Sequence, residues 1–319
     1  MMKGKSMAAI LLVTALGLTA CGGQGTGAAA SQEAAQEAQT GEAGGEQSEE
    51  ADGDELTGTD APEASKPEEG TQLDPGFSVE SGSIPEITIE AKQIPDKECF
   101  RFVKDMKTGW NLGNTLDAYS QGKMYGDDIS SEEIWGNPVT TKEMIDTLKN
   151  TGFRTVRIPV TWHNHVTDDG NGPVISEAWL DRVQEVVDYA YDNGMYVILN
   201  THHDNTANIE GEGGYYPDTA HAEESDRYIR GIWTQVAERF KDYDEHLIFE
   251  SLNEPRLAGT DYEWNFNAGV AECKDAAGSI NRLNQLFVGT VCATGGNNVE
   301  RYLMMQGSDA SLAGAITDL

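Results

Sequence analysis

A short apolar segment that ends in an amide and a carboxylic acid is the part of this sequence where chemistry is easiest to recognise. Residues 247–255 read Leu-Ile-Phe-Glu-Ser-Leu-Asn-Glu-Pro, and the proline ends the run. Such a run is typical of a strand buried on both faces of a parallel sheet. Asn253 and Glu254 would then lie at its carboxyl end, where an amide can bind a hydroxyl group and a carboxyl group can exchange a proton. We predict that Glu254 is a catalytic acid/base.

The elements that would position these residues alternate regularly from about Ile94 onward. Apolar runs predict strands near residues 109–114, 153–160, 195–200, 247–252 and 301–305, and amphipathic patterns predict helices near 140–151, 176–192, 223–243 and 279–290. This alternation predicts βαβ units around a parallel sheet.

Polar side chains recur where the predicted strands end, and the predicted helices show no such enrichment on their inner faces. They are Asn114, Arg157, His202, His203, Asn253 and Glu254. A (β/α)8 TIM barrel carries its active site at this end of its strands. We therefore expect an α/β chain of this class, with about the first five barrel strands present in residues 94–319.

The first 21 residues have the pattern of a bacterial lipoprotein signal. Lys3 and Lys5 precede an apolar stretch, which ends in Leu-Thr-Ala followed by Cys21. A basic start, a short apolar core and small residues before the cut are typical of a secretory signal peptide. The ending resembles a lipobox, which implies that Cys21 carries a lipid anchor and that the protein lies at the bacterial cell surface, outside the membrane.

Residues 22–93 are predicted to form a disordered acidic tether. From Gly22 to Glu80 the sequence contains fifteen acidic residues and one basic residue, Lys66, with almost no aromatic residues. Such a segment buries too little apolar surface to offset the entropy lost on ordering. Its charges repel one another, so it would extend and let an anchored domain reach an external polymer.

The net charge of −32 for 319 residues is spread over both the tether and the remaining domain. Nucleic acid is excluded as a partner because phosphate binding needs clustered Lys and Arg. Cys99, Cys273 and Cys292 remain after Cys21, and their spacing resembles no zinc site. We interpret them mostly as buried thiols, with one disulfide left open.

From about Ile94 to its end the chain resembles glycoside hydrolase family 5, in particular the bacterial endoglucanases. Five blocks carry the resemblance, in the expected order and spacing: Gly109–Ala118, Val156–Trp162, Val197–Asp204, Phe249–Arg256 and Thr294–Asn298. The resemblance implies retaining hydrolysis of a β-glucan by two carboxylates, with no cofactor and no metal. It favours β-1,4-glucan and leaves mixed-linkage glucan, xyloglucan, xylan and glucomannan open.

The resemblance also implies roles for individual residues. Glu254 would be the acid/base, Asn253 would bind the sugar 2-hydroxyl, and Arg157 would hold the nucleophile charged and oriented. His202 resembles the active-site histidine of the family. Asn114, His165 and His203 are expected to contact substrate or to support residues that do.

One departure from the family concerns the second carboxylate. The family's nucleophile is a glutamate on the seventh strand, whereas the fifth predicted strand ends near residue 305. The acids that follow Glu254, which are Glu263, Glu272 and Glu300, fall in loop or helix patterns. We therefore expect this chain to be an inactive fragment of an enzyme that is monomeric at full length.

Aromatic residues are candidates for stacking on sugar rings. Trp110, Trp162 and Trp264 lie in predicted loops or at strand ends and are candidate contacts. Trp179 and Trp233 fall on helix faces and are expected in the core. Trp135 and the pair Tyr215 and Tyr216 are left open between cleft and packing roles.

Two other classes of function compete with the glycosidase. His163-Asn164-His165 and His202-His203-Asp204 offer ligand types that zinc accepts, which would suit a metal-dependent hydrolase on the same fold. A surface protein that binds glycans without hydrolysing them is the other alternative. Bound metal would support the first, and unchanged behaviour of a Glu254→Gln variant would support the second.

Overall fold

The computed structural model describes residues 97–311 and residue 314. The predicted signal peptide, Cys21 and the acidic tether lie outside these residues. The described helices are α1 (Glu98–Met106), α2 (Lys142–Asn150), α3 (Glu177–Tyr191), α4 (Ala222–Arg239) and α5 (Ala271–Ala293). Short 3-10 turns occur at Ile129–Glu133, His163–His165, Gly296–Val299 and Ser308–Ala310. None of the described helices is long and apolar enough to cross a membrane.

Five parallel strands form the main sheet, and their order follows the chain. The strands are β1 (Gly109–Asn111), β2 (Thr155–Ile158), β5 (Tyr196–Asn200), β6 (Leu247–Glu250) and β7 (Leu303–Met304), paired in that order. Each of the five predicted strands is found, and helices α2 to α5 alternate with the strands as predicted. The arrangement confirms the expected fold class, a part of a (β/α)8 barrel.

A small antiparallel hairpin, which the sequence analysis missed, lies between β2 and α3. It pairs β3 (Val166–Asp168) with β4 (Pro173–Ile175). The Asp168 side chain accepts hydrogen bonds from the backbone of Gly170 and Gly172 and so closes the turn. Asp and Gly in a short segment between apolar residues are a recognised turn signal, so this hairpin could have been found from the sequence.

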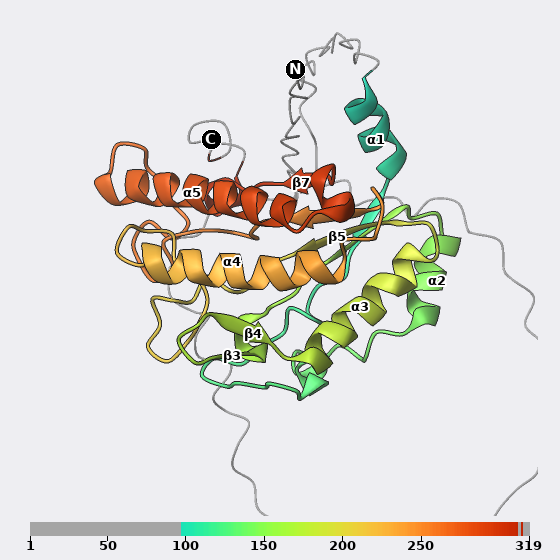
Figure 1. Ribbon diagram of the computed structural model, residues 1–319, viewed down its shortest axis with the longest axis horizontal. Coiled ribbons are helices and arrows are strands. Elements are labelled where there is room, and N and C mark those ends of the chain that lie inside the picture. Colours follow the sequence, from blue (N-terminus) through green and yellow to red (C-terminus); the bar gives the residue numbers. More distant parts are fainter. Residues whose placement is uncertain (1–96, 312–313, 315–319) are drawn as a thin grey trace, which may run out of the picture. The chain divides into compact units, whose positions relative to one another are not determined.

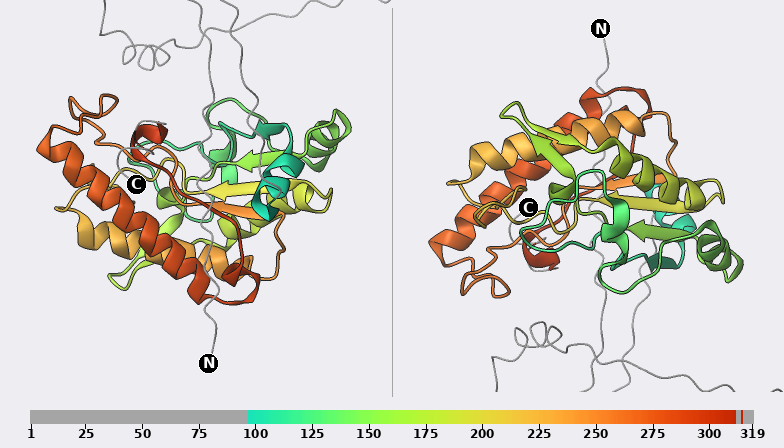
Figure 2. Two further views of the ribbon diagram at one scale, coloured as in Figure 1. Left: turned by 90° about the horizontal axis from the view of Figure 1, so that it is seen from above. Right: turned by 90° about the horizontal axis from the view of Figure 1, so that it is seen from below.

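The two faces of the main sheet have different surroundings. Alternate strand residues, including Val156, Leu199 and Phe249, pack into one large core with α2, α3, α4 and α5. Figures 1 and 2 show α4 and α5 side by side along this face. The intervening residues Ile198 and Ile248 belong to a smaller cluster on the other face, together with Met106 of α1. Because side chains alternate along a strand, the polar strand residues Arg157, Asn200 and Glu250 also point to this second face.

Helix ends agree closely with the sequence expectations where a capping side chain is present. Thr141 and Ser176 accept hydrogen bonds from backbone amides three residues onward and begin α2 and α3. Helix α5 begins at Ala271, eight residues before the predicted start near Ser279. The preceding residue, Val270, has no capping side chain, so residue types alone do not mark this helix start. Cys99, Cys273 and Cys292 are all free thiols, and only Cys273 is fully buried.

A buried carboxylate joins the loops that leave β2 and β5. Asp204 Oδ1 accepts hydrogen bonds from the backbone amides of Trp162 and His163, at 2.9 and 2.7 Å, and from the Tyr228 hydroxyl of α4 at 2.7 Å. The ring of His163 lies between two acids, with Nδ1 3.2 Å from Asp204 Oδ1 and Nε2 3.1 Å from Glu212 Oε2. Burial opposes a charge on His163, but the two carboxylates outweigh it and raise its pKa to about 9.

The charged His163 predicts a specific dependence of stability on pH. In the unfolded chain the pKa is about 6.5, so the protonated ring stabilises the fold fully below that pH and loses this effect as pH rises towards 9. The free energy of unfolding should fall by up to about 3 kcal/mol over this range because of His163. Urea unfolding of the native protein and of His163→Gln should be measured from about pH 6 to about pH 9.5, which spans the titration of His163. The free energy of unfolding should fall clearly less in the variant than in the native protein.

His246→Gln is the matched control, because the His246 side chain is 30% exposed and pairs with Asp244. It should keep the native pH slope. Equal slopes for the native protein and His163→Gln would show that His163 does not carry the proton in the fold.

Candidate active site

Arg157 is the centre of a polar network on the face of the sheet away from α2 to α5. Its Nε and Nη2 donate to the two carboxylate oxygens of Glu250 at 2.7 and 2.9 Å. Nη1 donates to Asn111 Oδ1 and Nη2 to Asn253 Oδ1, both at 2.9 Å. Gln306 Nε2 completes the network by donating to Glu250 at 2.7 Å. Side chains from or next to β1, β2, β6 and β7 therefore meet at the carboxyl end of the sheet.

The pairing of Arg157 with Glu250 offsets the cost of burying a carboxylate at this position. Only 2% of the Glu250 side chain is exposed, so an unpaired carboxylate there would be costly. Burial alone would lower the pKa of Arg157, whereas the charge and the hydrogen bonds of Glu250 raise it above its ordinary value. The bidentate geometry satisfies both carboxylate oxygens and fixes the plane of the guanidinium group.

Asn253 and Glu254 follow β6, as predicted. Because Asn253 Oδ1 accepts from Arg157, the amide nitrogen is the end that remains to donate to a ligand. The Glu254 side chain is 39% exposed, and Arg256 Nη1 lies 3.7 Å from its Oε2. A partly exposed carboxyl group beside an oriented amide donor can exchange a proton with a bound hydroxyl or ether oxygen.

His202 and His203 follow β5 and lie beside Asp117. Their Nε2 atoms are 3.8 and 3.6 Å from Asp117 Oδ2, too far for direct hydrogen bonds. His202 is largely buried, and burial first, then the charges of His203 and Arg157, lowers its pKa well below the usual value. His202 is therefore neutral near pH 7. Asp117 was not predicted as a site residue, although it lies in the first of the five family-like blocks.

Two residues predicted to contact substrate are buried instead. Trp162 is fully buried in the main core, and its indole Nε1 donates to the backbone oxygen of Asn200. His165 stacks on Trp179 with ring centroids 3.8 Å apart, and its nitrogens lie 2.8 Å from Gly126 O and 2.9 Å from Ser131 Oγ. Burial lowers the pKa of His165 to about 4, so it is neutral. These positions argue against sugar contacts, because neither ring has a surface to offer.

The exposed tryptophans differ in their relation to the network. Trp110 is 47% exposed but lies on the opposite face of β1 from Asn111, with its ring edge against Phe153. Trp135 is 41% exposed, and its ring centroid lies 5.5 Å from that of His203. Its indole nitrogen donates to Tyr119 O at 3.0 Å, which holds the ring in place. Trp135, whose role was left open from the sequence, is therefore an exposed tryptophan in contact with His203.

Trp264 is 60% exposed on the segment after β6. The Arg256 guanidinium lies over its ring, 4.3 Å from the centroid, and pairs with Glu263 at 3.1 Å. Trp264 is thus linked through Arg256 to Glu254.

Asn114 is exposed on the loop after β1 with a left-handed backbone (φ 61°), and its contact with substrate stays a prediction. Trp179 and Trp233 are buried in the core, as expected.

The groups that were considered as zinc ligands do not meet as one set. His163 lies with Asp204 and Glu212, whereas His165 is buried against Trp179. A different set, Asp117, His202 and His203, brings one ligand atom each within 4.8 Å of the others. Whether this set suits a metal depends on which nitrogen of His202 carries its proton.

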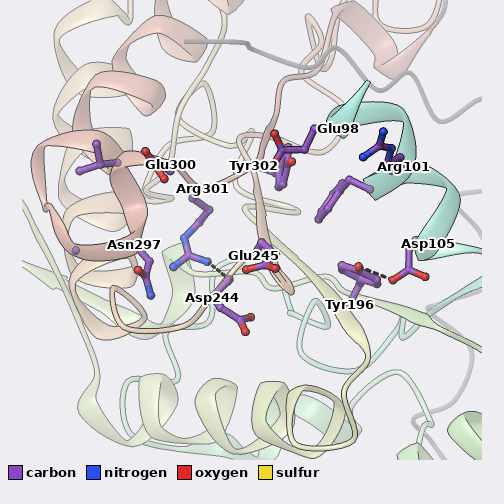
Figure 3. A pocket seen from close by; sticks show the side chains of 13 residues that line it. Glu98, Arg101, Asp105, Tyr196, Asp244, Glu245, Asn297, Glu300, Arg301 and Tyr302 are labelled. Carbon is purple, nitrogen blue, oxygen red and sulfur yellow. Dashed lines mark hydrogen bonds between the residues drawn. The ribbon is translucent and has the colours of Figure 1, made fainter. Parts of the chain in front are cut away.

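A hollow of about 740 Å³ lies at the amino end of the strands, away from the network. Figure 3 shows the Arg301 side chain and Tyr196 within it, with the Tyr196 hydroxyl directed at Asp105. Arg301 donates to the backbone oxygens of four residues, Phe240, Tyr243, Asp244 and Leu247. Burial lowers the pKa of Arg301 to about 10. Its donors are used to hold the chain between α4 and β6, so the hollow is not the predicted site.

Comparison with known proteins agrees with this geometry. The family model of cellulases, glycosyl hydrolase family 5, matches residues 116–317. Endoglucanase A of Ruminococcus albus is 48% identical over 227 residues, which cover 71% of this chain and 57% of that protein. Endoglucanase A of Clostridium longisporum is 46% identical over 226 residues, covering 70% and 40%. The chain thus spans about half the length of these relatives.

Solved structures resemble the chain in fold as well as in sequence. A family 5 lichenase from Caldicellulosiruptor sp. F32, in complex with cellotetraose, is 52% identical with a TM-score of 0.68 and covers 74% of this chain and 61% of its own. A broad-specificity endoglucanase from Ruminococcus champanellensis with bound cellotriose is 43% identical with a TM-score of 0.63, covering 72% and 63%. The family model matches more than half of the residues, in a region that contains Arg157, Glu250 and Asn253. The chain therefore belongs to glycosyl hydrolase family 5.

Proposed function

We propose that the protein hydrolyses internal β-1,4 linkages of a β-glucan with retention of configuration, and that Glu254 is its acid/base. The observation that carries the proposal is the network around Arg157, which fixes Asn253 next to Glu254 at the carboxyl end of the sheet. In a TIM barrel this end of the strands carries the chemistry. The relatives that cover most of this chain are named endoglucanases, which supports the same class of reaction.

In the proposed reaction Glu254 acts twice. Its carboxyl group first gives a proton to the glycosidic oxygen while a second carboxylate attacks the anomeric carbon and forms a glycosyl-enzyme. The Glu254 carboxylate then takes a proton from the water that releases the sugar. The family resemblance implies that the second carboxylate lies on the seventh strand of the complete barrel. The described sheet contains five strands, of which β7 is the fifth, so that barrel strand is not among them.

The orientation of Asn253 explains how the protein would bind substrate at this point. Arg157 occupies the carbonyl end of the amide, so Nδ2 can donate to the 2-hydroxyl of the sugar. Hydrogen bonds to this hydroxyl strengthen in the oxocarbenium-like transition state. Arg157 itself is held charged by Glu250, so its field would also favour an ionised nucleophile nearby.

A β-glucan is the substrate that the relatives support. One solved relative is a lichenase bound to cellotetraose, another is a broad-specificity endoglucanase bound to cellotriose, and a third is named a xyloglucan-specific endo-β-1,4-glucanase. All three names involve a β-glucan or a β-1,4-linked backbone. Trp135 lies beside His203 and Trp264 lies under Arg256, and both exposed rings would stack on the sugars.

We also propose that the protein acts at the bacterial cell surface as a lipoprotein. The support is the sequence alone: a basic start, a short apolar core and the Leu-Thr-Ala-Cys ending at Cys21. An acidic tether of residues 22–93 would separate the lipid from the catalytic domain. This arrangement suits an enzyme whose substrate is an external polymer too large to enter the cell.

Replacing Glu254 by Gln in the natural protein should abolish proton donation while keeping the shape of the site. We expect kcat/KM to fall by about 10²–10⁴-fold on an aryl cellobioside with a poor leaving group, and much less with an activated one. Cellotetraose affinity, measured by calorimetry, should change little. Glu263→Gln is the matched control, since Glu263 also pairs with Arg256 but should leave activity intact.

Equal losses for both leaving groups would remove Glu254 from the acid/base role. A native protein that binds cellotetraose without turnover would instead support a surface glycan-binding protein.

Replacing Trp135 by Ala should weaken cellotetraose binding by about tenfold, since a stacked aromatic ring contributes on the order of 1 kcal/mol. Trp110→Ala is the matched control, because Trp110 is similarly exposed but points to the other face of β1. Calorimetric titration of both variants checks the comparison. A loss in Trp110→Ala equal to that in Trp135→Ala would contradict the placement of the substrate beside His203.

Replacing Cys21 by Ala should release the protein from membranes. We expect the native protein to take up labelled fatty acid and to sediment with the membrane fraction, and the variant to do neither. Cys99→Ala serves as the control, because Cys99 lies within the folded domain. Membrane association of Cys21→Ala at the native level would exclude the lipid anchor.

A further inference from the structure

Asn200, the last residue of β5, lies between a backbone amide and the ring of His202. It is fully buried, and its Oδ1 accepts a hydrogen bond from the backbone amide of Val160 at 3.2 Å. Its Nδ2 lies 3.0 Å from His202 Nδ1.

The direction of these two contacts follows from the backbone. A backbone N–H can only donate, so the oxygen of the Asn200 amide must face Val160. The amide nitrogen, which can only donate, then faces His202. His202 Nδ1 must therefore accept, and an accepting ring nitrogen carries no proton.

The protonation state of the ring completes the argument. His202 is largely buried and lies near His203 and Arg157, conditions that disfavour a positive charge and lower its pKa. A neutral imidazole with a bare Nδ1 holds its single proton on Nε2. This Nε2 lies 3.8 Å from Asp117 Oδ2, which is too long for a hydrogen bond and leaves the N–H able to bind another acceptor.

We propose that Asn200 is a positioning residue that fixes the tautomer of His202, so that His202 presents an Nε2–H donor to a hydroxyl oxygen of the substrate. The part of this inference that concerns substrate rests on the proposed function. The part that concerns the tautomer depends only on Asn200, Val160 and His202.

The tautomer of His202 also determines whether Asp117, His202 and His203 favour a metal ion or a hydroxyl group. A metal ion bound to His202 Nε2 would require the proton on Nδ1, where it would point at the amide hydrogens of Asn200. Asn200 therefore opposes metal binding and favours a hydroxyl group. A sugar hydroxyl could accept from the histidines and donate to Asp117 in the space between them.

Nitrogen NMR of the natural protein with labelled histidine tests the tautomer directly. There are six histidines in this sequence, and His202→Gln identifies the signals of His202 by their loss. We expect Nδ1 to be unprotonated and Nε2 to be protonated at pH 7. A protonated Nδ1 in the native protein would overturn the proposal without the need for any variant. Loss of the Nε2 proton on addition of Zn²⁺ alone would overturn it as well.

Asn200→Asp is the sharpest variant, because it replaces the donating NH₂ by an oxygen of nearly the same size. One oxygen can still accept from Val160, while the other now requires a proton on His202 Nδ1. The spectrum should show that proton. Asn208→Asp is the matched control: it adds the same charge to the exposed part of the loop after β5 and should leave the His202 signals unchanged.

Calorimetry with cellotetraose then tests the link to substrate. Measured at a pH where the spectrum shows a single proton on the His202 ring, Asn200→Asp should weaken binding by about tenfold, the effect of one hydrogen bond. In a His202→Ala background the same change should alter affinity less than about twofold, because the donor is already absent. Equal losses in both backgrounds would show that Asn200 acts on stability and not through His202.

The two measurements separate the two proposals. The expected tautomer in a protein that does not bind cellotetraose would uphold the role of Asn200 on His202 and refute the proposed substrate. Binding of cellotetraose with the opposite tautomer would uphold the function and refute the role of Asn200.

Discussion

Burying the carboxylate of Glu250 would cost several kcal/mol if no cation met it, and Arg157 meets it with two hydrogen bonds. The remaining donors of Arg157 reach Asn111 and Asn253, so a single guanidinium group connects β2 to β1 and to the end of β6 by hydrogen bonds. The arrangement depends on the register of the sheet, because Asn111 is opposite Arg157 and Glu250 is opposite Asn200. A shift by one residue would send these polar groups into the apolar core with the helices.

The loops beyond the strands are fixed by a second buried carboxylate. Asp204 receives two backbone amides from the loop after β2 and a hydroxyl from α4, and His163 links it to Glu212. The two loops that leave β2 and β5 are therefore tied to each other as well as to the sheet. His202 and His203 belong to one of these loops, so their positions relative to Arg157 depend on Asp204 as much as on β5.

The fold was predictable from the sequence because its main signals are local. Apolar runs and helical periodicity place the five strands and the four long helices, and Thr141 and Ser176 set helix starts as their residue types suggest. Glu254, Asn253, Arg157 and His202 were predicted as site residues because they end or follow strands. Trp162 and His165 also follow a strand, yet the 3-10 turn at His163–His165 turns both side chains inward. Their burial depends on Trp179 and Asn200, which are distant in sequence, and no local pattern reports it.

Glu250 and Asn200 were not predicted as site residues, because each is a polar residue within an apolar strand and was read as part of that strand. Both point to the sheet face away from α2 to α5, where polar side chains can meet one another. What each residue contributes there is a direction of hydrogen bonding. Glu250 can only accept, so Arg157 donates to it and then, through a second hydrogen, to the carbonyl of Asn253. The Asn253 amide nitrogen is thereby left as the donor that the proposed substrate would meet.

Asn200 sets a direction of hydrogen bonding in the same way. The backbone amide of Val160 donates to its oxygen, so its nitrogen donates to His202. Each series of hydrogen bonds begins at a group with one hydrogen-bonding role. The buried Glu250 carboxylate accepts, and the backbone N–H of Val160 donates. In the proposed site each series would end at a donor available to the substrate, Asn253 Nδ2 in one and His202 Nε2 in the other. A site that presents fixed donors is suited to a ligand rich in hydroxyl oxygens, and it is poorly suited to a metal ion, which needs lone pairs in the same positions.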